Sequence, residues 1–162
     1  MFFDVHGLLM PFLKAVIEIE ISQSPDVTTL FRSTTFAAVL LSSVCKRIAT
    51  PYVTRIVKPF VEHLRLHTIA SLELNPTQTR DAASIPESAM QLADLTANLH
   101  DAVTNSLSTI PMSLRIICHL LYEAVVAKFS EHATSVVAGM FFLRVVCPLI
   151  LAPEGLGITT ST

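Results

Sequence analysis

The sequence is poor in glycine, tryptophan and charge. It has 4 glycines and no tryptophan among 162 residues, and only 15% of its residues are charged. An average soluble domain carries about 25% charged residues. So few glycines argue against a turn-rich all-β fold. The hydrophobic content of 51% excludes an intrinsically disordered chain, which needs low hydrophobicity and high net charge.

A dominant charge of one sign is also missing. The chain has 11 Lys and Arg against 13 Asp and Glu, which gives a net charge of −2. Nucleic acid is therefore not an expected partner, because phosphate contacts need clustered cations. A locally basic stretch at 46–65 has two interpretations: a solvated helix face, or a contribution to docking an acidic protein surface.

Three cysteines lack the spacing of a zinc site or a disulfide framework. Cys45, Cys118 and Cys147 contain no CxxC pair and stand among apolar residues, where free cysteine behaves as a small hydrophobe. A reducing, cytoplasmic compartment is the simpler interpretation. We also expect no metal site, because the histidines are scattered and the pair at His63 and His67 has no flanking HExxH arrangement.

The sequence contains no uninterrupted apolar stretch long enough to span a membrane. A spanning helix needs about 20 mostly apolar residues. The best candidate, residues 136–152, has Arg144 at its centre and Pro148 near its end. A central arginine costs about 2.5–3.5 kcal/mol on insertion scales. We therefore expect no transmembrane segment and interpret the apolar content as helices that pack on several sides.

The apolar spacing predicts an all-α array of about six to seven helices. Apolar residues recur at intervals of three and four in runs that start near residues 8, 36, 51, 85, 112 and 135. Ser33, Thr34 and Thr35 can cap the second run, and Ser84 with Glu87 looks like a capping box. We expect Pro51 to start a helix, and Pro59 to kink or divide it.

The sequence gives no case for hydrolysis performed with its own residues, but two arginines stand out. There is no glycine-rich phosphate loop. Arg32 directly precedes a capped helix, where Leu30 and Phe31 can anchor the segment while Arg32 points outward; an ordinary solvated arginine is the alternative. Arg144 lies in a very apolar helix, where a charge is costly unless it snorkels or is hydrogen-bonded.

The segments around both arginines resemble the GTPase-activating proteins for Ras. Thr29-Leu30-Phe31-Arg32, followed by Thr34-Thr35-Phe36-Ala37, is similar to the family's finger-loop motif. Phe142-Leu143-Arg144 with Pro148 is similar to its second signature. Segments 73–76 and 111–122 match further family segments in the same order, and the resemblance covers about residues 8–158.

The resemblance implies a GTPase activator that stimulates GTP hydrolysis by a GTP-bound, Ras-type small GTPase and thereby limits Ras signalling. Arg32 would be an arginine finger inserted in trans, and Arg144 would stabilise the finger loop from within. The chain would not be an enzyme in its own right and would need no cofactor, because the partner holds GTP and Mg²⁺. The residues expected to bind the partner are Leu30, Phe31, Thr34, Phe142, Leu143 and Pro148.

The chain departs from the family pattern at Leu149, where the family usually has Ala, and at Ala152, where it usually has a small polar residue. The family's catalytic domain also continues with further helices, so we expect residues 1–162 to form a single, truncated domain. The alternative is a non-catalytic member of the fold that binds a small GTPase as a scaffold or effector. We expect a cytoplasmic protein, with indirect recruitment to the inner face of the plasma membrane left open.

Overall fold

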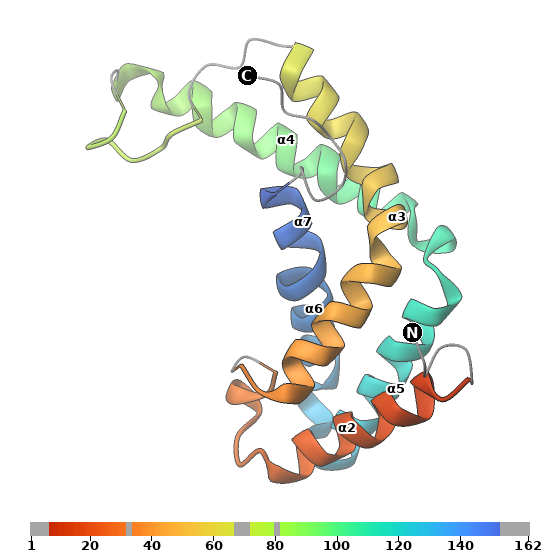
Figure 1. Cartoon of the computed structure of the whole chain (residues 1–162). Helices are drawn as coiled ribbons and strands as arrows, with labels where there is room; N and C mark the ends of the chain where they lie inside the picture. The colour runs from red at the N-terminus through yellow and green to blue at the C-terminus, as the bar shows by residue number, and fades with distance from the viewer. Residues whose placement is uncertain (1–6, 32–33, 67–71, 80–81, 153–162) are drawn as a thin grey trace. The chain divides into compact units, whose positions relative to one another are not determined.

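The computed structural model describes residues 7–31, 34–66, 72–79 and 82–152, and its regular structure is helical (Figure 1). Between α6 and α7 the chain forms a π-helical segment, and no strand occurs in the described residues, which confirms the predicted all-α class. The helices are α2 (Leu9–Gln23), α3 (Phe36–Leu66), α4 (Ile85–Asn105), α5 (Met112–Phe129), α6 (Ala133–Phe141), the π-helical segment (Phe142–Val146) and α7 (Cys147–Leu151). Short 3₁₀ turns lie at Val27–Thr29, Ala82–Ser84, Leu107–Thr109 and Ser130–His132.

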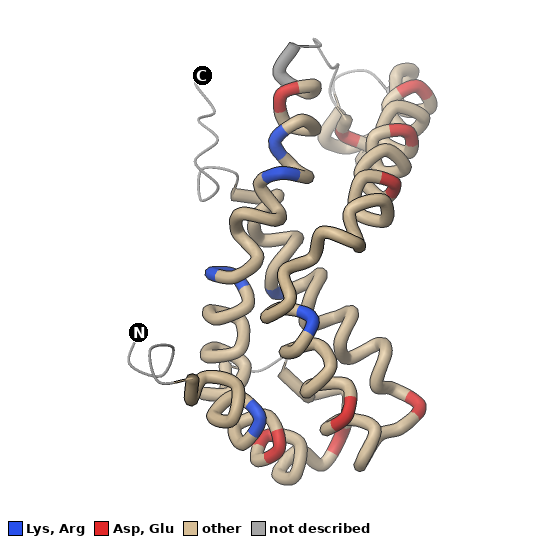
Figure 2. The backbone as a smooth tube through the Cα atoms, turned by 90° about the vertical axis from the view of Figure 1, so that its right-hand side faces the viewer, with Lys and Arg blue, Asp and Glu red and all other residues tan. Residues whose placement is uncertain are grey.

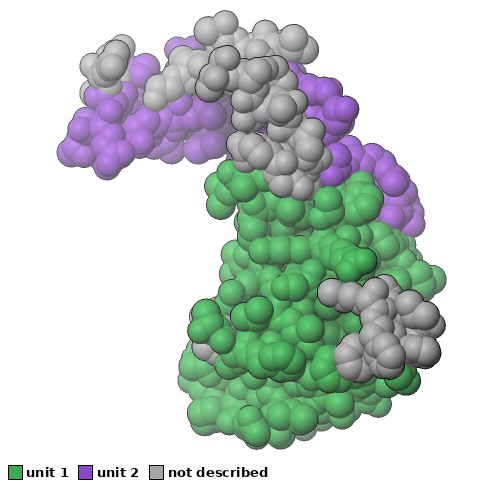
Figure 3. Space-filling view, in the orientation of Figure 1, with its two compact units in different colours: residues 1–53, 110–162 green, residues 54–109 purple. Residues whose placement is uncertain are grey.

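The chain divides into two compact units (Figure 3). Unit 1 comprises residues 1–53 and 110–162, and unit 2 comprises residues 54–109. In unit 1, α5 packs against both α2 and α6. Its core includes one stripe of α2 and one stripe of α5, each at helical spacing: Leu13, Ile17, Ile21, Leu114, Ile117, Leu121 and Val125. That residues 1–162 form a single, truncated domain stays a prediction.

The helix α3 continues through both prolines that were expected to interrupt it. It runs from Phe36 to Leu66, so the predicted helix start at Pro51 was wrong. Pro59 was expected to kink or divide the helix; it does not divide it, and the kink stays a prediction. A proline inside a helix costs about 3 kcal/mol. Val53 and Val57 are each 1% exposed, and burying one valine side chain contributes about 1.5–3 kcal/mol. Burial beside the prolines therefore offsets their cost.

The two predicted helix caps have different outcomes. The Thr35 hydroxyl accepts a hydrogen bond from the Ala38 N–H at 3.2 Å and donates one to the Glu20 carboxylate at 2.9 Å, so Thr35 caps α3 and links it to α2. Ser84 makes no side-chain cap hydrogen bond, so the predicted capping box was wrong. The reason is that Ser84 already has helical backbone angles at the end of a 3₁₀ turn, whereas a capping residue usually has extended ones.

Most of the backbone carries neither Lys and Arg nor Asp and Glu (Figure 2). In unit 2, α4 carries Glu87, Asp94 and Asp101 and no Lys or Arg. In unit 1, Arg144 is the single Lys, Arg, Asp or Glu between residues 132 and 152. An isolated charge in so apolar a stretch needs a hydrogen-bond partner or access to solvent.

Two segments are long and apolar enough to cross a membrane by length and composition alone: Phe36–Leu64 and Met112–Leu151. In the structure the second segment contains the 3₁₀ turn Ser130–His132, and the helices on either side of the turn, α5 and α6, pack against each other. The helices of a protein core have the same composition when they are buried. The absence of a transmembrane segment stays a prediction.

Burial makes the thiol of Cys45 inert. Its side chain is 3% exposed on α3, and burial raises its pKa from 9.0 to about 12. A raised pKa means that the folded state prefers the neutral thiol. The resulting stabilisation is fully present below about pH 9 and is lost as the pH rises toward 12.

We therefore expect iodoacetamide to alkylate Cys45 about a thousandfold more slowly in the native chain than in the guanidinium-unfolded chain at pH 8, because only the thiolate reacts. Mass spectrometry of the peptide containing Cys45 measures both rates. Equal rates in the two states would contradict the burial of this thiol.

Candidate functional site

The loop between α2 and α3 is organised by a capped 3₁₀ turn. The Asp26 carboxylate accepts a hydrogen bond from the Thr28 N–H at 2.9 Å and so caps the turn Val27–Thr29. Hydrogen bonds from Thr28 hold the pKa of the Asp26 carboxyl below its usual range. The charged form of Asp26 is thus the form that shapes the first half of the loop.

Phe31 gives the loop a sharp backbone turn. Its φ of +54° lies in the left-handed region, which bulky residues rarely adopt and which costs about 1–3 kcal/mol. Such a conformation persists only where its surroundings hold it. Phe31 is 3% exposed and Leu30 is 4% exposed, so both side chains anchor the loop in the core. Their burial leaves a partner protein only their backbone to contact.

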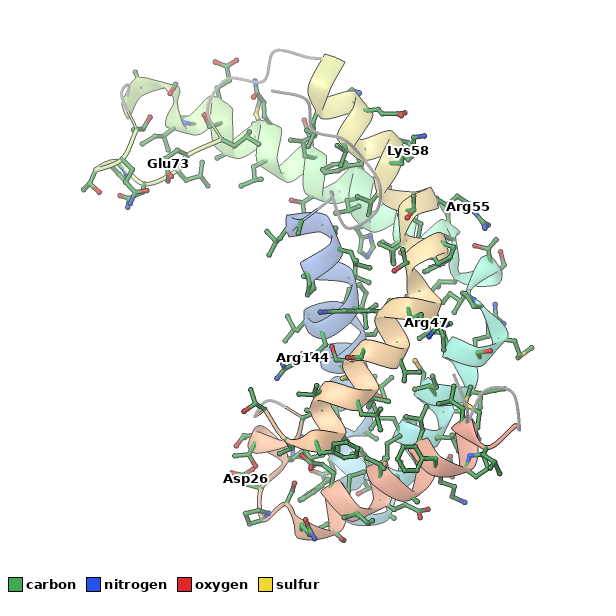
Figure 4. The ribbon with its side chains drawn as sticks, in the orientation of Figure 1. Asp26, Arg47, Arg55, Lys58, Glu73 and Arg144 are labelled. Atoms are coloured by element: carbon green, nitrogen blue, oxygen red, sulfur yellow. The ribbon has the colours of Figure 1, made fainter. Side chains whose placement is uncertain are left out.

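The Arg144 guanidinium holds the backbone at this turn. Its Nη2 donates a hydrogen bond to the Phe31 carbonyl oxygen at 2.8 Å (Figure 4 labels Arg144 and Asp26). Such a bond from a charged donor contributes about 1.5–3 kcal/mol. Of the two interpretations left open for Arg144, snorkelling or a structural hydrogen bond, the structure contains the hydrogen bond.

Arg144 lies in the π-helical segment, and Pro148 explains why. The Cys147 N–H donates to the Phe142 carbonyl five residues earlier, as in a π-helix. Pro148 has no N–H, so the Arg144 carbonyl lacks its α-helical donor. The Ser42 hydroxyl of α3 donates to that carbonyl instead, at 3.4 Å. Arg144 is therefore held through its backbone while its side chain holds the loop.

Sequence reasoning missed the π-helical segment and Ser42. The available signal was Pro148, which stands four residues after Arg144 and so removes the donor to its carbonyl. Single-turn π segments inside α-helices occur frequently at functional sites. The contact from Ser42 had no signal, because it depends on how α3 meets a segment about 100 residues away.

Exposed apolar residues flank the arginine. Phe142 is 42% exposed and Leu143 is 63% exposed. Thr34 is exposed as well, and Pro148 is half-buried. Phe36, which was not predicted as a contact residue, is 68% exposed in the first turn of α3. Four of the predicted partner-binding side chains thus remain at least partly open to solvent.

A cavity of about 210 Å³ lies beneath the loop. Its walls come from residues 27–31 of the loop and from residues 132–144, including Gly139 and Met140. A Cβ at Gly139 would meet no atom within 4 Å. Leu30, Phe31 and Arg144 also line this cavity, so it lies beside the residues that anchor the loop.

Arg32 and Ser33 lie outside the described residues, as do residues 153–162. The outward direction of Arg32 and its role stay predictions. In the part of the chain that the structure describes, no group of three or more His, Cys, Asp or Glu residues could hold a metal ion. The hydrogen bond between Arg144 and the Phe31 carbonyl holds the loop backbone at the residue before Arg32.

Residues 81–162 match the family model for the GTPase-activator protein for Ras-like GTPase. The chain is 30% identical over 146 residues to Ras GTPase-activating protein 1 of Homo sapiens, which covers 88% of this chain and 14% of that protein. It is 27% identical over 156 residues to the GTPase-activating protein of Drosophila melanogaster, which covers 94% of this chain and 13% of the relative. A probable Ras GTPase-activating-like protein, ngap, of Dictyostelium discoideum is 24% identical over 155 residues, 94% of this chain and 18% of the relative. The chain thus spans less than a fifth of the length of these relatives.

Replacing Arg144 by alanine should lower the free energy of unfolding by about 1–3 kcal/mol, because the Phe31 carbonyl loses its charged donor. Urea denaturation measures the change. Arg115→Ala is the control, since Arg115 is an exposed arginine of α5 whose Nε donates locally to the Ile110 carbonyl. An Arg144→Ala chain as stable as the control would contradict the bracing role.

Proposed function

Because this chain belongs to the family of GTPase-activator proteins for Ras-like GTPases, we propose that it binds a GTP-loaded, Ras-type small GTPase and accelerates hydrolysis of the bound GTP. One observation carries the proposal. The hydrogen bond from Arg144 fixes the carbonyl of Phe31, the residue directly before Arg32. A side chain that must reach into another protein's nucleotide site needs its backbone fixed in this way.

In this proposal Arg32 acts as an arginine finger in trans. During hydrolysis, negative charge on the transferred phosphoryl oxygens and the leaving oxygen needs compensation. A guanidinium suits the task because it is always charged and presents several donors in one plane. For Ras-type GTPases, a finger supplied from outside is worth about 10³–10⁵ in kcat, or roughly 4–7 kcal/mol of the barrier.

The chain contributes position and charge, while the partner contributes the nucleotide and its Mg²⁺. The strained turn at Phe31 supports this division of roles. Phe31, the residue before Arg32, has its backbone in the left-handed region, which persists only where its surroundings hold it. Its carbonyl is held by Arg144 and its ring is buried, so Phe31 is fixed from both sides. The activity would take place in the cytoplasm, with any membrane recruitment indirect.

The docking surface in this proposal is the exposed apolar patch of Phe142 and Leu143, together with Thr34. Exposed large apolar residues next to one another are a feature of protein–protein contact sites. Arg144 follows this patch directly in the sequence, and it is also the residue that holds the finger loop. Docking and finger placement would therefore depend on the same turn of helix.

Arg32→Ala should lower the single-turnover rate of GTP hydrolysis by about a thousandfold at saturating chain, while affinity for the GTPase changes much less. Arg32→Lys should recover little of the rate, because an ammonium lacks the planar fork. The measurement is phosphate release from a GTP-loaded Ras-type GTPase mixed with each chain, and Arg115→Ala serves as the control.

An unchanged rate in Arg32→Ala would show that the finger assignment is wrong. Binding of the GTPase without any acceleration by the wild-type chain would favour the scaffold or effector role. Acceleration of hydrolysis by the wild-type chain that is kept in Arg115→Ala and lost in Arg32→Ala would favour the activator over the scaffold or effector.

Leu143→Glu should raise the half-saturating concentration of chain about tenfold or more, because a carboxylate in the apolar patch is desolvated on docking. The rate at saturation should change little, since Leu143 does not act on the nucleotide. Titration of the same single-turnover assay measures both quantities. Met112→Glu is the matched control, because Met112 is 68% exposed at the start of α5, outside the patch. Equal effects of the two variants would contradict this docking surface.

A further inference from the structure

A second cation, Lys128, holds the other end of the loop that carries Arg32. The Lys128 ammonium, in the last turn of α5, donates to the carbonyl oxygens of Ile21, Ser22 and Ser24 at 3.0, 3.0 and 2.8 Å. These carbonyls belong to the C-terminal end of α2 and to the residue that follows it. One side chain thus collects three backbone acceptors from a segment more than 100 residues away.

The chemistry of the contact is well matched. The last carbonyls of a helix have no partner within the helix, and the C-terminal end of a helix carries partial negative charge. An ammonium has three N–H donors, and all three acceptors here lie within hydrogen-bond distance. Lys128 therefore serves both as a cap for α2 and as a link between α2 and α5.

The position of this cap matters because α2 ends where the finger loop begins. Ser24 is the first residue after α2, and Phe31 is the last residue before Arg32. Lys128 holds the carbonyl at the first position, and Arg144 holds the carbonyl at the second. Both contacts are made to backbone, so they fix the path of the loop without requiring particular loop side chains.

We propose that Lys128 is a positioning residue for the arginine finger, acting on Arg32 through the upstream end of the loop as Arg144 does through the downstream end. The inference rests on the proposed function above and names a residue that this function does not by itself require. With Lys128 removed, the segment from Ser24 to Phe31 keeps its buried side chains but gains freedom at its entry. A displacement of the loop by about 1 Å would move Arg32 out of line with the phosphoryl group, while the docking patch stays intact.

The test compares Lys128→Met, Lys128→Arg and the control Lys14→Met in the full chain. Methionine keeps the length of the side chain without its donors, and arginine restores several donors. Lys14 is an exposed lysine of α2 in a surface pair with Glu18 at 3.8 Å, so it controls for the loss of one charge in the same unit. Single-turnover hydrolysis by a GTP-loaded Ras-type GTPase, titrated with each chain, gives a maximal rate and a half-saturating concentration. Hydrogen exchange by mass spectrometry reports the protection of residues 24–31.

We expect Lys128→Met to lower the maximal rate about 10- to 100-fold, as small misplacements of a catalytic group do, with the half-saturating concentration changed by less than about threefold. Residues 24–31 should exchange faster, while the buried parts of α2 and α5 keep their protection. Lys128→Arg should recover most of the maximal rate and most of the protection of residues 24–31, and Lys14→Met should match the wild type.

Full activity of Lys128→Met alongside an active wild-type chain would overturn this inference and leave the proposed function standing. Uniform loss of protection across α2 and α5 would also overturn it, because the effect would then be general unfolding. A wild-type chain that does not accelerate hydrolysis would overturn the proposed function, and with it any catalytic role for Lys128. Exchange at residues 24–31 would then decide whether Lys128 anchors the loop at all.

Discussion

The hydrogen bond from Arg144 to the Phe31 carbonyl is the interaction on which the rest of the site depends. It joins the loop between α2 and α3 to the helical segment that carries the exposed patch. It also holds in place a backbone conformation that costs about 1–3 kcal/mol. A hydrogen bond from a charged donor contributes a similar amount, so the bond and the strain are close to balance. The burial of Leu30 and Phe31 then decides which conformation of the loop persists.

Two cations of unit 1, Arg144 and Lys128, donate to backbone carbonyls of a distant segment. Arg144 serves the strained turn, and Lys128 serves the end of α2. Pro148 creates a further acceptor at the Arg144 carbonyl, which Ser42 satisfies. In an interior this apolar, an unsatisfied carbonyl costs about 1–3 kcal/mol. These polar side chains of unit 1 therefore link segments that are about 100 residues apart in the sequence. Two of them, Lys128 and Arg144, hold the two ends of the segment from Ser24 to Phe31.

Helical periodicity predicted the all-α class, because that class follows from the spacing of apolar residues within each helix. The resemblance implied that Arg144 stabilises the loop, and the Arg144 guanidinium donates to the Phe31 carbonyl. Periodicity failed where packing between elements decides the outcome. Pro51 lies inside α3 instead of starting a helix. The burial of Val53 and Val57 offsets the cost of a proline inside the helix. The contacts of Lys128 and Ser42 depend on segments about 100 residues apart, which no local pattern reports.

In the proposed function, Arg144 acts on GTP hydrolysis through Arg32 and not beside it. A double-mutant cycle on the single-turnover rate tests it directly, with Arg32→Ala, Arg144→Ala and the combined variant measured at saturating chain. If Arg144 only positions the finger, the combined variant should be about as slow as Arg32→Ala alone, since no finger remains to be positioned. If the two losses multiply, Arg144 contributes independently of Arg32, and the account given for this loop is wrong.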